Sequence, residues 1–131
     1  MNKKVTGEFE VNIIPQEDRE IPNLARMTID KQFHGDLEAI SRGQMLSAAT
    51  AVQDSAGYVA IERVEGKLEG LKGSFVLLHV GIMNKGESSL TITVIPDSGT
   101  DSLVGLTGVL DIKMVEGKHF YDFSYSLSDT E

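Results

Sequence analysis

The sequence GYVAIERVEGKLEGLKGSFVLLHVGIM, residues 57–83, decides the fold of this chain. It is rich in β-branched and other apolar residues, and a cluster of glycines interrupts it near the centre, which is the pattern of two strands joined by a turn. We therefore predict one strand from about Gly57 to Leu68 and a second from about Gly73 to Met83.

Alternation of apolar and polar residues dominates the rest of the chain, and turn residues recur about every ten to fifteen positions. Further strands are predicted at about Val5–Ile13, Met27–His34, Gly43–Ala49, Leu90–Val94, Thr107–Val115 and Lys118–Leu127, with a charged loop at Pro15–Pro22. Closure of such a meander removes its exposed edges. The predicted fold is all-β, a closed or nearly closed antiparallel barrel of about eight strands with meander topology, formed by residues 1–131 as a single domain.

The stretch Asp36 to Ala51 also fits a helix, because it contains leucines and several alanines. Glycine is less favourable than alanine in a helix by about 1 kcal/mol, and Gly35 and Gly43 lie beside and within the stretch. A strand is therefore the preferred interpretation.

Composition excludes several classes of function. The net charge of −8 argues against binding to nucleic acid and to anionic membranes, since both require a basic surface. The chain has no cysteine, which excludes disulfides, thiolate nucleophiles and cysteine-ligated metals. Glu8 and Glu10 interrupt the segment where a signal peptide needs an apolar run, and no run is long enough to span a membrane. We expect a cytoplasmic protein without a metal or organic cofactor.

The first turn determines which residues of the hairpin at 57–83 face one another. If Gly70 and Leu71 form a two-residue turn with glycine first, Glu69 faces Lys72 as a favourable charge pair. This register sets Glu62 opposite His79. One face of the hairpin is then apolar apart from one acid and one imidazole; it carries Tyr58, Ala60, Glu62, Val64, Phe75, Leu77 and His79.

Glu116 and Gly117 predict a second two-residue turn, between Val115 and Lys118. A slip by one residue would bring Asp111 and Lys113 against aromatic side chains, so the pattern itself supports this register. The expected pairs are Met114–His119, Ile112–Tyr121 and Leu110–Phe123, and the shared inner face carries His119, Tyr121, Phe123, Tyr125 and Leu127.

Glu62 and His79 are the candidate functional pair. A carboxylate inside a barrel costs several kcal/mol unless it is paired, and the imidazole would supply the pairing. A carboxylate beside an imidazole in apolar surroundings is also the arrangement that general acid–base chemistry uses. The alternative is a satisfied polar network that only fixes the strand register. For His119, beside a turn, exposure to solvent competes with a functional role.

The opposite face of the same hairpin is apolar as well; it carries Val59, Ile61, Val76, Leu78, Val80 and Ile82. A barrel wall that is apolar on both faces implies that something covers its outer side. A homo-oligomer, dimer or higher, is the simplest cover, and a terminal arm folded over the barrel is the rival.

Other polar groups carry weaker signals. No hydrolase or dinucleotide motif is present, and no metal-ligand spacing is found among the three histidines, His34, His79 and His119. The loop Ser98–Asp101 fits a polar turn better than an anion site. Arg26, Asp30 and His34 fit a solvated strand face. The methionines expected to fill the core are Met27, Met45, Met83 and Met114.

Five stretches of the chain resemble a bacterial family, the domain of unknown function 3224. They are Gly57–Arg63, Gly66–Gly70, Gly73–His79, Pro96–Thr100 and His119–Phe123, and the similarity extends from about Phe33 to Leu127. The family pattern often has glycine after the threonine, where this chain has Asp101. The resemblance implies a β-barrel similar to that of allene oxide cyclase and no established activity. The polar positions that match are Glu62, Arg63, His79, Ser98, Thr100, His119 and Tyr121.

Three functions follow as hypotheses. The first is a module that binds a small, partly apolar ligand in the lumen or mouth, with Glu62 and His79 as polar anchors. With Tyr121, the residues expected to contact the ligand are Tyr58, Arg63, Phe75, Ser98, Thr100, His119, Phe123 and Tyr125. The second is an isomerase- or cyclase-like enzyme in which Glu62 and His79 move protons and Tyr121 donates a hydrogen bond. The third is a non-catalytic oligomer joined through the outer face of the hairpin at 57–83.

Overall fold

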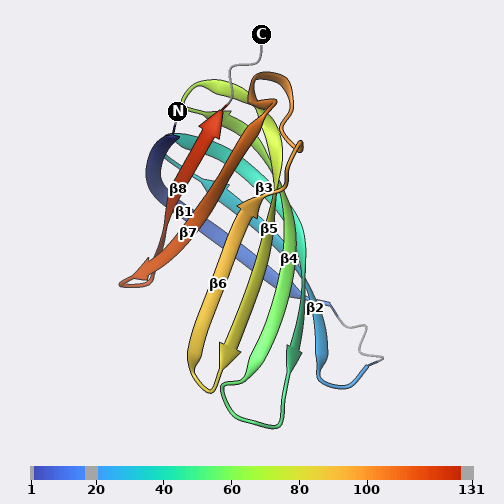
Figure 1. Cartoon of the computed structure of the whole chain (residues 1–131). Helices are drawn as coiled ribbons and strands as arrows, with labels where there is room; N and C mark the ends of the chain where they lie inside the picture. The colour runs from blue at the N-terminus through green and yellow to red at the C-terminus, as the bar shows by residue number, and fades with distance from the viewer. Residues whose placement is uncertain (1, 17–20, 128–131) are drawn as a thin grey trace.

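The computed structural model describes residues 2–16 and 21–127, and this part of the chain forms a closed antiparallel barrel of eight strands (Figure 1). The predicted meander is confirmed, because each strand pairs with the next and β8 returns to β1. A short 3₁₀ helix, η1 (Asp101–Leu103), lies between β6 and β7. The strands are β1 (Asn2–Pro15), β2 (Leu24–Phe33), β3 (Leu37–Ala49), β4 (Ala56–Leu68), β5 (Leu71–Asn84), β6 (Glu87–Val94), β7 (Leu106–Val115) and β8 (Lys118–Leu127).

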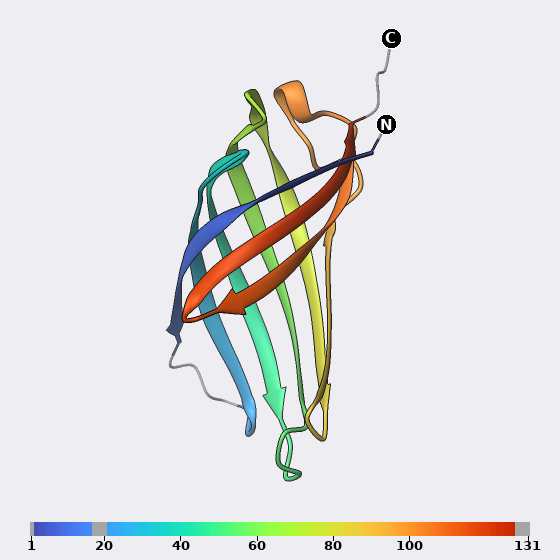
Figure 2. The ribbon, with the colours of Figure 1, turned by 90° about the vertical axis from the view of Figure 1, so that its left-hand side faces the viewer.

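The barrel wall is uneven. Strands β2 to β6 run nearly side by side, whereas β1, β7 and β8 cross them obliquely (Figure 2). Strands β1 and β8 pair from Asn2 with Ser126 to Phe9 with His119. Among the described residues, β6 and β7 share a single pair, Thr93 with Val109, and the two strands diverge beyond it (Figure 1). The wall therefore opens between β6 and β7 toward the end that carries the β3–β4 and β5–β6 turns. We call that end the mouth, and the opposite end the core end.

At the core end the lumen is filled by side chains. Six inward-facing aromatic residues are buried there, and they are Phe9, Phe33, Phe75, Tyr121, Phe123 and Tyr125. The rings of Phe75 and Phe123 are stacked with centroids 5.8 Å apart, and those of Phe123 and Tyr125 with centroids 5.4 Å apart. Aromatic rings of this size bury a large apolar area and leave little free volume between them. The packed core is therefore what holds the barrel closed.

The connection from β6 to β7 lies beside the core end of β5 and forms hydrogen bonds with its backbone, as a neighbouring strand would. Ser98 Oγ accepts a 3.0 Å hydrogen bond from the backbone N–H of Val76, and Thr100 Oγ1 accepts one of 3.0 Å from that of Ser74. Leu103 of η1 is buried against the core. The loop thus satisfies the edge of β5 where β6 has ended, as buried backbone groups require.

The β4–β5 register differs from the predicted one by two residues, so the proposed Gly70-Leu71 turn is wrong. Glu69 and Gly70 form the turn, with φ of 47° and 84°, and Leu68 faces Leu71. Two positive φ values are typical of the type I′ turn, which matches strand twist and accepts glycine in second place. Glu62 consequently faces Leu77, and His79 faces Ala60. Because side chains alternate with a period of two, a shift by two leaves each residue on its predicted face.

The other boundaries agree in part with the sequence. The β7–β8 register is confirmed, since Val115 faces Lys118 and Met114 faces His119. The helix considered for Asp36–Ala51 is wrong, because β3 spans Leu37–Ala49 and begins six residues before the predicted strand. Of the predicted loop at Pro15–Pro22, Pro15 belongs to β1 and residues 17–20 lie outside the described part of the chain.

Candidate functional site

A layer of polar side chains lies beneath the core, on inward-facing positions of β2, β3, β4 and β5. Glu62 is at its centre with 0% of its surface exposed, and its Oε1 accepts a 2.6 Å hydrogen bond from Ser41 Oγ. The other oxygen, Oε2, lies 2.8 Å from Lys31 Nζ and 2.5 Å from His79 Nε2. Lys31 and His79 are buried too. We call Lys31, Ser41, Glu62 and His79 the polar layer.

The polar layer keeps Glu62 ionised. Burial on its own raises the pKa of the Glu62 carboxyl, because a low-dielectric interior disfavours the charged form. The hydrogen bond from His79, the charge and hydrogen bond of Lys31 and the hydrogen bond from Ser41 outweigh burial and lower that pKa from 4.5 to about 2. At neutral pH Glu62 is therefore a fixed negative charge that orients its donors.

Gly43 of β3 provides the room for this carboxylate. It faces Glu62 across the β3–β4 pair, and a Cβ built on it would lie 2.6 Å from Glu62 Cα and 2.2 Å from the carbonyl oxygen of Ile61. Both obstructing atoms belong to the backbone and have no freedom to move aside. Only glycine lets β3 and β4 approach so closely at this rung.

His79 retains an accessible ring nitrogen. Its Nε2 is occupied by Glu62, and no other group of the described residues bonds the ring. Within the same residues, every buried side-chain nitrogen and oxygen atom has a hydrogen-bond partner. Nδ1 of His79 therefore keeps some contact with solvent, although the residue as a whole is only 3% exposed.

A hollow of about 340 Å³ lies at the mouth, on the inner side of β3, β4, β5 and β6. Tyr58 stands between this hollow and the polar layer. Its ring covers Gly81, where a Cβ would lie 2.2 Å from Tyr58 Cε1, so Gly81 makes space for the ring. Burial, followed by the charge of Glu62, raises the pKa of the Tyr58 hydroxyl. The inward-facing residues that line the hollow are Met45, Ser47, Ala56, Tyr58, Gly81, Met83, Ser88 and Leu90.

The methionines do not fill the core, so that expectation is wrong. Met83 is 40% exposed and Met114 is 66% exposed, and Met27 and Met45, which face each other, are only half-buried. They occupy inward-facing positions at strand segments beyond the packed core, where the divergence of β6 and β7 leaves no partner layer opposite. Flexible, polarizable methionine side chains are over-used at surfaces that accommodate varied ligands.

The remaining predicted contact residues lie elsewhere. Phe75, Phe123 and Tyr125 are buried in the core. Arg63 lies on the outer side of β4 and bonds Glu65 and Ser74, while Ser98 and Thr100 bond the backbone of β5. None of these six residues lines the hollow at the mouth.

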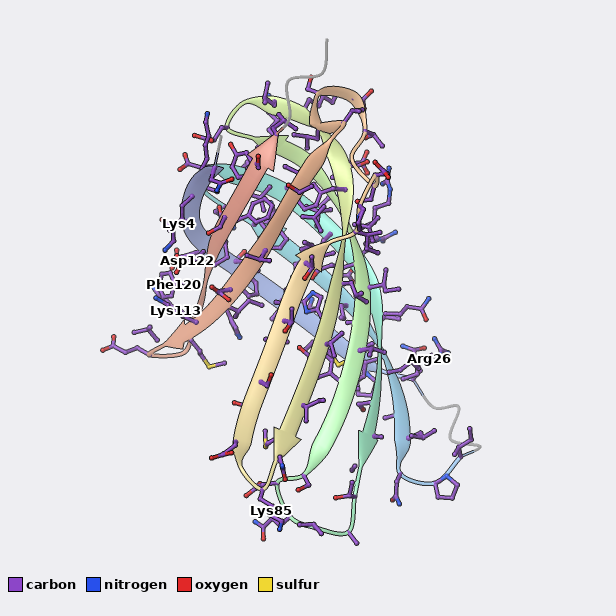
Figure 3. The ribbon with its side chains drawn as sticks, in the orientation of Figure 1. Lys4, Arg26, Lys85, Lys113, Phe120 and Asp122 are labelled. Atoms are coloured by element: carbon purple, nitrogen blue, oxygen red, sulfur yellow. The ribbon has the colours of Figure 1, made fainter. Side chains whose placement is uncertain are left out.

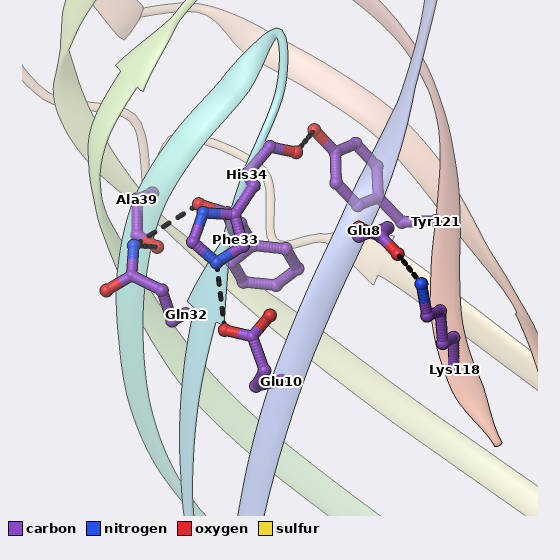
Figure 4. A network of polar contacts seen from close by, with 8 residues as sticks. All are labelled: Glu8, Glu10, Gln32, Phe33, His34, Ala39, Lys118 and Tyr121. Atoms are coloured by element: carbon purple, nitrogen blue, oxygen red, sulfur yellow. Dashed lines mark hydrogen bonds and ion pairs between the residues drawn. The ribbon is translucent and has the colours of Figure 1, made fainter.

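His119 and Tyr121 lie near the polar layer without bonding it. The half-buried ring of His119 is 5.2 Å from that of Phe9, over which the ammonium of Lys31 lies at 5.1 Å. The Tyr121 hydroxyl donates to the carbonyl oxygen of His34 at 2.8 Å and accepts from the N–H of Leu37 at 3.0 Å (Figure 4). Tyr121 therefore holds the β2–β3 turn in place.

The surface around that turn is charged. His34 Nε2 lies 2.8 Å from Glu10 Oε1, and this hydrogen bond raises the pKa of the exposed His34 ring above 6.5 (Figure 4). Lys118 forms a 3.9 Å ion pair with Glu8. His34 is thus an exposed partner of β1 and is separate from the polar layer.

Lys31 is the site residue that the sequence reasoning missed. Lys31 is separated from Met27, Ile29 and Phe33 by even numbers of residues, so it points to the same side of the strand as they do. The alternation that predicted β2 therefore also places this lysine on the inner face. A lysine on an apolar phase indicates a buried partner of opposite charge, because buried charges are otherwise costly. The alternation therefore indicated that Lys31 needs a buried acidic partner, while the pairing of β2 with β3 and of β3 with β4 decides that the partner is Glu62.

No cluster of three or more histidine, cysteine, aspartate or glutamate residues that would hold a metal is found in the described ranges. In the same ranges, no helix has the length and apolar character needed to cross a membrane. The polar layer and the hollow near it therefore form the candidate functional site.

These features define the class of the protein as a small meander barrel with a packed core end, a buried polar layer and an open, apolar mouth. The chain belongs to a family described as protein of unknown function (DUF3224), whose model matches residues 5–125. No curated protein matches the chain.

A solved structure supports the same assignment. It is a DUF3224 family protein of unknown function from Shewanella oneidensis MR-1, similar to this chain with a TM-score of 0.93 and 48% sequence identity. The match covers 99% of this chain and 100% of the other.

Proposed function

We propose that this protein binds a small, partly apolar ligand at the mouth of the barrel, against the polar layer. The observation that carries the proposal is the hollow of about 340 Å³, lined on its inner side by Met45, Tyr58, Met83 and Leu90. Ligand sites are concave, mostly apolar and supplied with a few placed polar groups. Here Tyr58 is a placed polar group in the wall of the hollow, and His79, which does not line it, belongs to the polar layer behind Tyr58.

The position of the ligand follows from where the barrel is full. The core end holds packed aromatic rings, so a ligand there would have to displace them. At the mouth, by contrast, Met83 and Leu90 are 40% and 43% exposed on inward-facing positions. Covering these side chains with an apolar ligand would be favourable by about 25 cal/mol per Å² of apolar surface removed from water.

Binding of 1-anilinonaphthalene-8-sulfonate, an anionic and apolar fluorescent probe, tests the proposal. Met83→Asp places a charge in the hollow. Val109→Asp is its control, because Val109 of β7 is exposed by 47%, against 40% for Met83, and does not line the hollow. We expect saturable binding of one probe per chain to the parent. It should weaken by roughly tenfold or more in Met83→Asp, as a lost contact of about 1.4 kcal/mol implies, and remain unchanged in Val109→Asp.

A probe that binds without saturation, or whose binding Val109→Asp weakens as much as Met83→Asp, would contradict a site at the mouth. Circular dichroism and thermal unfolding of both variants show that each is folded before its affinity is compared.

A second candidate is an isomerase- or cyclase-like activity, which the resemblance to the allene oxide cyclase barrel suggests. Its support is the 2.5 Å contact of His79 Nε2 with Glu62, which leaves the other ring nitrogen to exchange a proton with a ligand. Glu62, held ionised, would orient the imidazole and would not itself carry the proton. A turnover rate that follows the titration of a single group and disappears in His79→Ala would support this activity.

A further inference from the structure

The outer face of β2, β3, β4 and β5 is apolar and exposed. Leu46 of β3 is 55% exposed, Ile61 of β4 is 53% exposed, and Ile82 of β5 is 58% exposed. With Leu24, Val59 and Val80, which are 41–43% exposed, they form what we call the outer patch. A monomeric protein rarely exposes a contiguous apolar surface of this kind, and such surfaces mark interaction sites.

The outer patch is shaped to receive side chains. Two shallow hollows, of about 410 Å³ and 510 Å³, lie along it. Leu46 and Val59 line both of them, so the hollows adjoin at the centre of the patch. Ile61 and Ile82, which are more than half exposed, belong to the walls of these hollows, so a copy could place its own Ile61 and Ile82 side chains into them. A face that offers both protrusions and hollows can be complementary to itself.

Charge on this face does not oppose self-association. Three arginines border the patch: Arg26, Arg42 and Arg63. Two acidic residues border it as well, and each forms an ion pair: Asp30 with Arg42 at 3.5 Å, and Glu65 with Arg63 at 2.9 Å. Among the described residues, three cations and two anions border this surface, in a chain whose net charge is −8. Figure 3 shows Arg26 on the flank opposite to Lys4, Lys113 and Asp122.

The face is also large enough for a dimer. The outward apolar positions of β5 run from Val76 to Ile82, which is about 20 Å at about 3.4 Å per residue. Across four strands about 4.8 Å apart, this length gives a projected area on the order of 400 Å². Side-chain relief and the arginine rim enlarge the accessible area toward the roughly 800 Å² per partner that a stable interface buries.

We propose that a second copy of this chain covers the outer patch, sheet against sheet, around a two-fold axis. In such an isologous contact the same residues meet from both sides, so one substitution is introduced twice in each dimer. An aspartate in the patch would be buried opposite an apolar surface and near its own copy, which opposes association.

Light scattering coupled to size exclusion tests this proposal on the full chain. Val59→Asp is the disrupting variant, and Val109→Asp is its control, because both valines are outward-facing and exposed by 43% and 47%, on β4 and β7 respectively. We expect the parent chain and Val109→Asp to have twice the monomer mass of 14.3 kDa, and Val59→Asp to have that mass once. Circular dichroism and thermal unfolding verify that both variants are folded.

Two results would overturn the proposal. One is a parent chain that stays monomeric at concentrations up to about 1 mM. A dissociation constant above about 1 mM corresponds to a free energy of association weaker than about 4 kcal/mol. The other is an assembly that Val59→Asp leaves intact while folded, since the copies would then meet through another surface. A change of salt concentration should matter little, because the contact is apolar at its centre.

Discussion

At the scale of single residues, the most important feature is how the neighbours of Glu62 compensate the burial of its negative charge. Its carboxylate has 0% exposure and three donors, of which Lys31 is charged and His79 lies at 2.5 Å. Removing one partner of a buried charge pair costs about 3–5 kcal/mol, whereas replacing both partners by neutral groups is often tolerated. The polar layer is therefore expected to behave as one unit in mutagenesis.

We predict that Glu62→Gln destabilises the protein at pH 7 by about 3–5 kcal/mol, because it leaves the ammonium of Lys31 buried without a counter-charge. Urea unfolding measures the loss. The double variant Lys31→Met with Glu62→Gln should recover much of the lost stability. If Glu62→Gln alone does not fold, a folded double variant tests the same charge pair. A double variant no more stable than Glu62→Gln would show that the charge pair is not the cause.

The same pair predicts the response to acid. The pKa of Glu62 in the folded protein is about 2, below its ordinary value of 4.5, so the ionised carboxylate stabilises the fold above pH 4.5. That stability is lost as the pH falls from 4.5 through about 2. The stability difference between the parent and Glu62→Gln should therefore shrink by about 3 kcal/mol across this range. A difference that stays constant with pH would contradict a lowered pKa.

At the scale of elements, the close approach of β3 and β4 shapes the site. Gly43 has no space for a Cβ, whereas a Cβ on Gly57, also in the β3–β4 pair, would meet its nearest atom at 3.7 Å. Both glycines lie in the β3–β4 pair, Gly43 on the inner face and Gly57 on the outer face, and only Gly57 has room for a Cβ.

We predict that Gly43→Ala destabilises the protein by about 1–3 kcal/mol or more, because backbone atoms of β4 must be displaced. Gly57→Ala should change the free energy of unfolding by no more than about 0.5 kcal/mol. Chemical denaturation of both variants makes the comparison. Equal effects would mean that β3 and β4 are farther apart at Gly43 than the structure places them.

At the scale of the whole molecule, the opening between β6 and β7 distinguishes the two ends of the barrel. Strand β4 has hydrogen-bonded neighbours on both sides along its length, but β6 has β5 on one side and, among the described residues, only the Thr93–Val109 pair on the other. Opening at the mouth is therefore expected to need less free energy than opening at the core end.

Native-state hydrogen exchange, read by NMR, checks this expectation. Successive residues of an antiparallel strand direct their N–H groups to alternate neighbours, so every second amide between Glu87 and Ile92 should exchange quickly. The amides of β4 should exchange at least about 100-fold more slowly, as paired core strands do. Uniform protection along β6 would show that its outer edge is covered.

The sequence predicted the site in part. Periodicity placed Glu62 and His79 on one inner face, and their contact survived a turn that was wrongly positioned, because a two-residue shift preserves faces. It did not identify Lys31, since β2 reaches Glu62 only after β2 pairs with β3 and β3 with β4. The predicted ligand contacts at Phe75 and Phe123 belong instead to the packed core.

The sequence by itself determined the all-β meander, the inward and outward faces of its strands and the pairing around Glu116 and Gly117. These properties depend on the residues of each turn and on the alternation of apolar and polar residues, and both can be read from residues that are neighbours in the sequence. Only the tertiary structure decided where the lumen is full and where it is open. That distinction depends on how β1, β7 and β8 cross the other strands and on the single closing pair of β6 and β7, and both are long-range properties of the closed barrel.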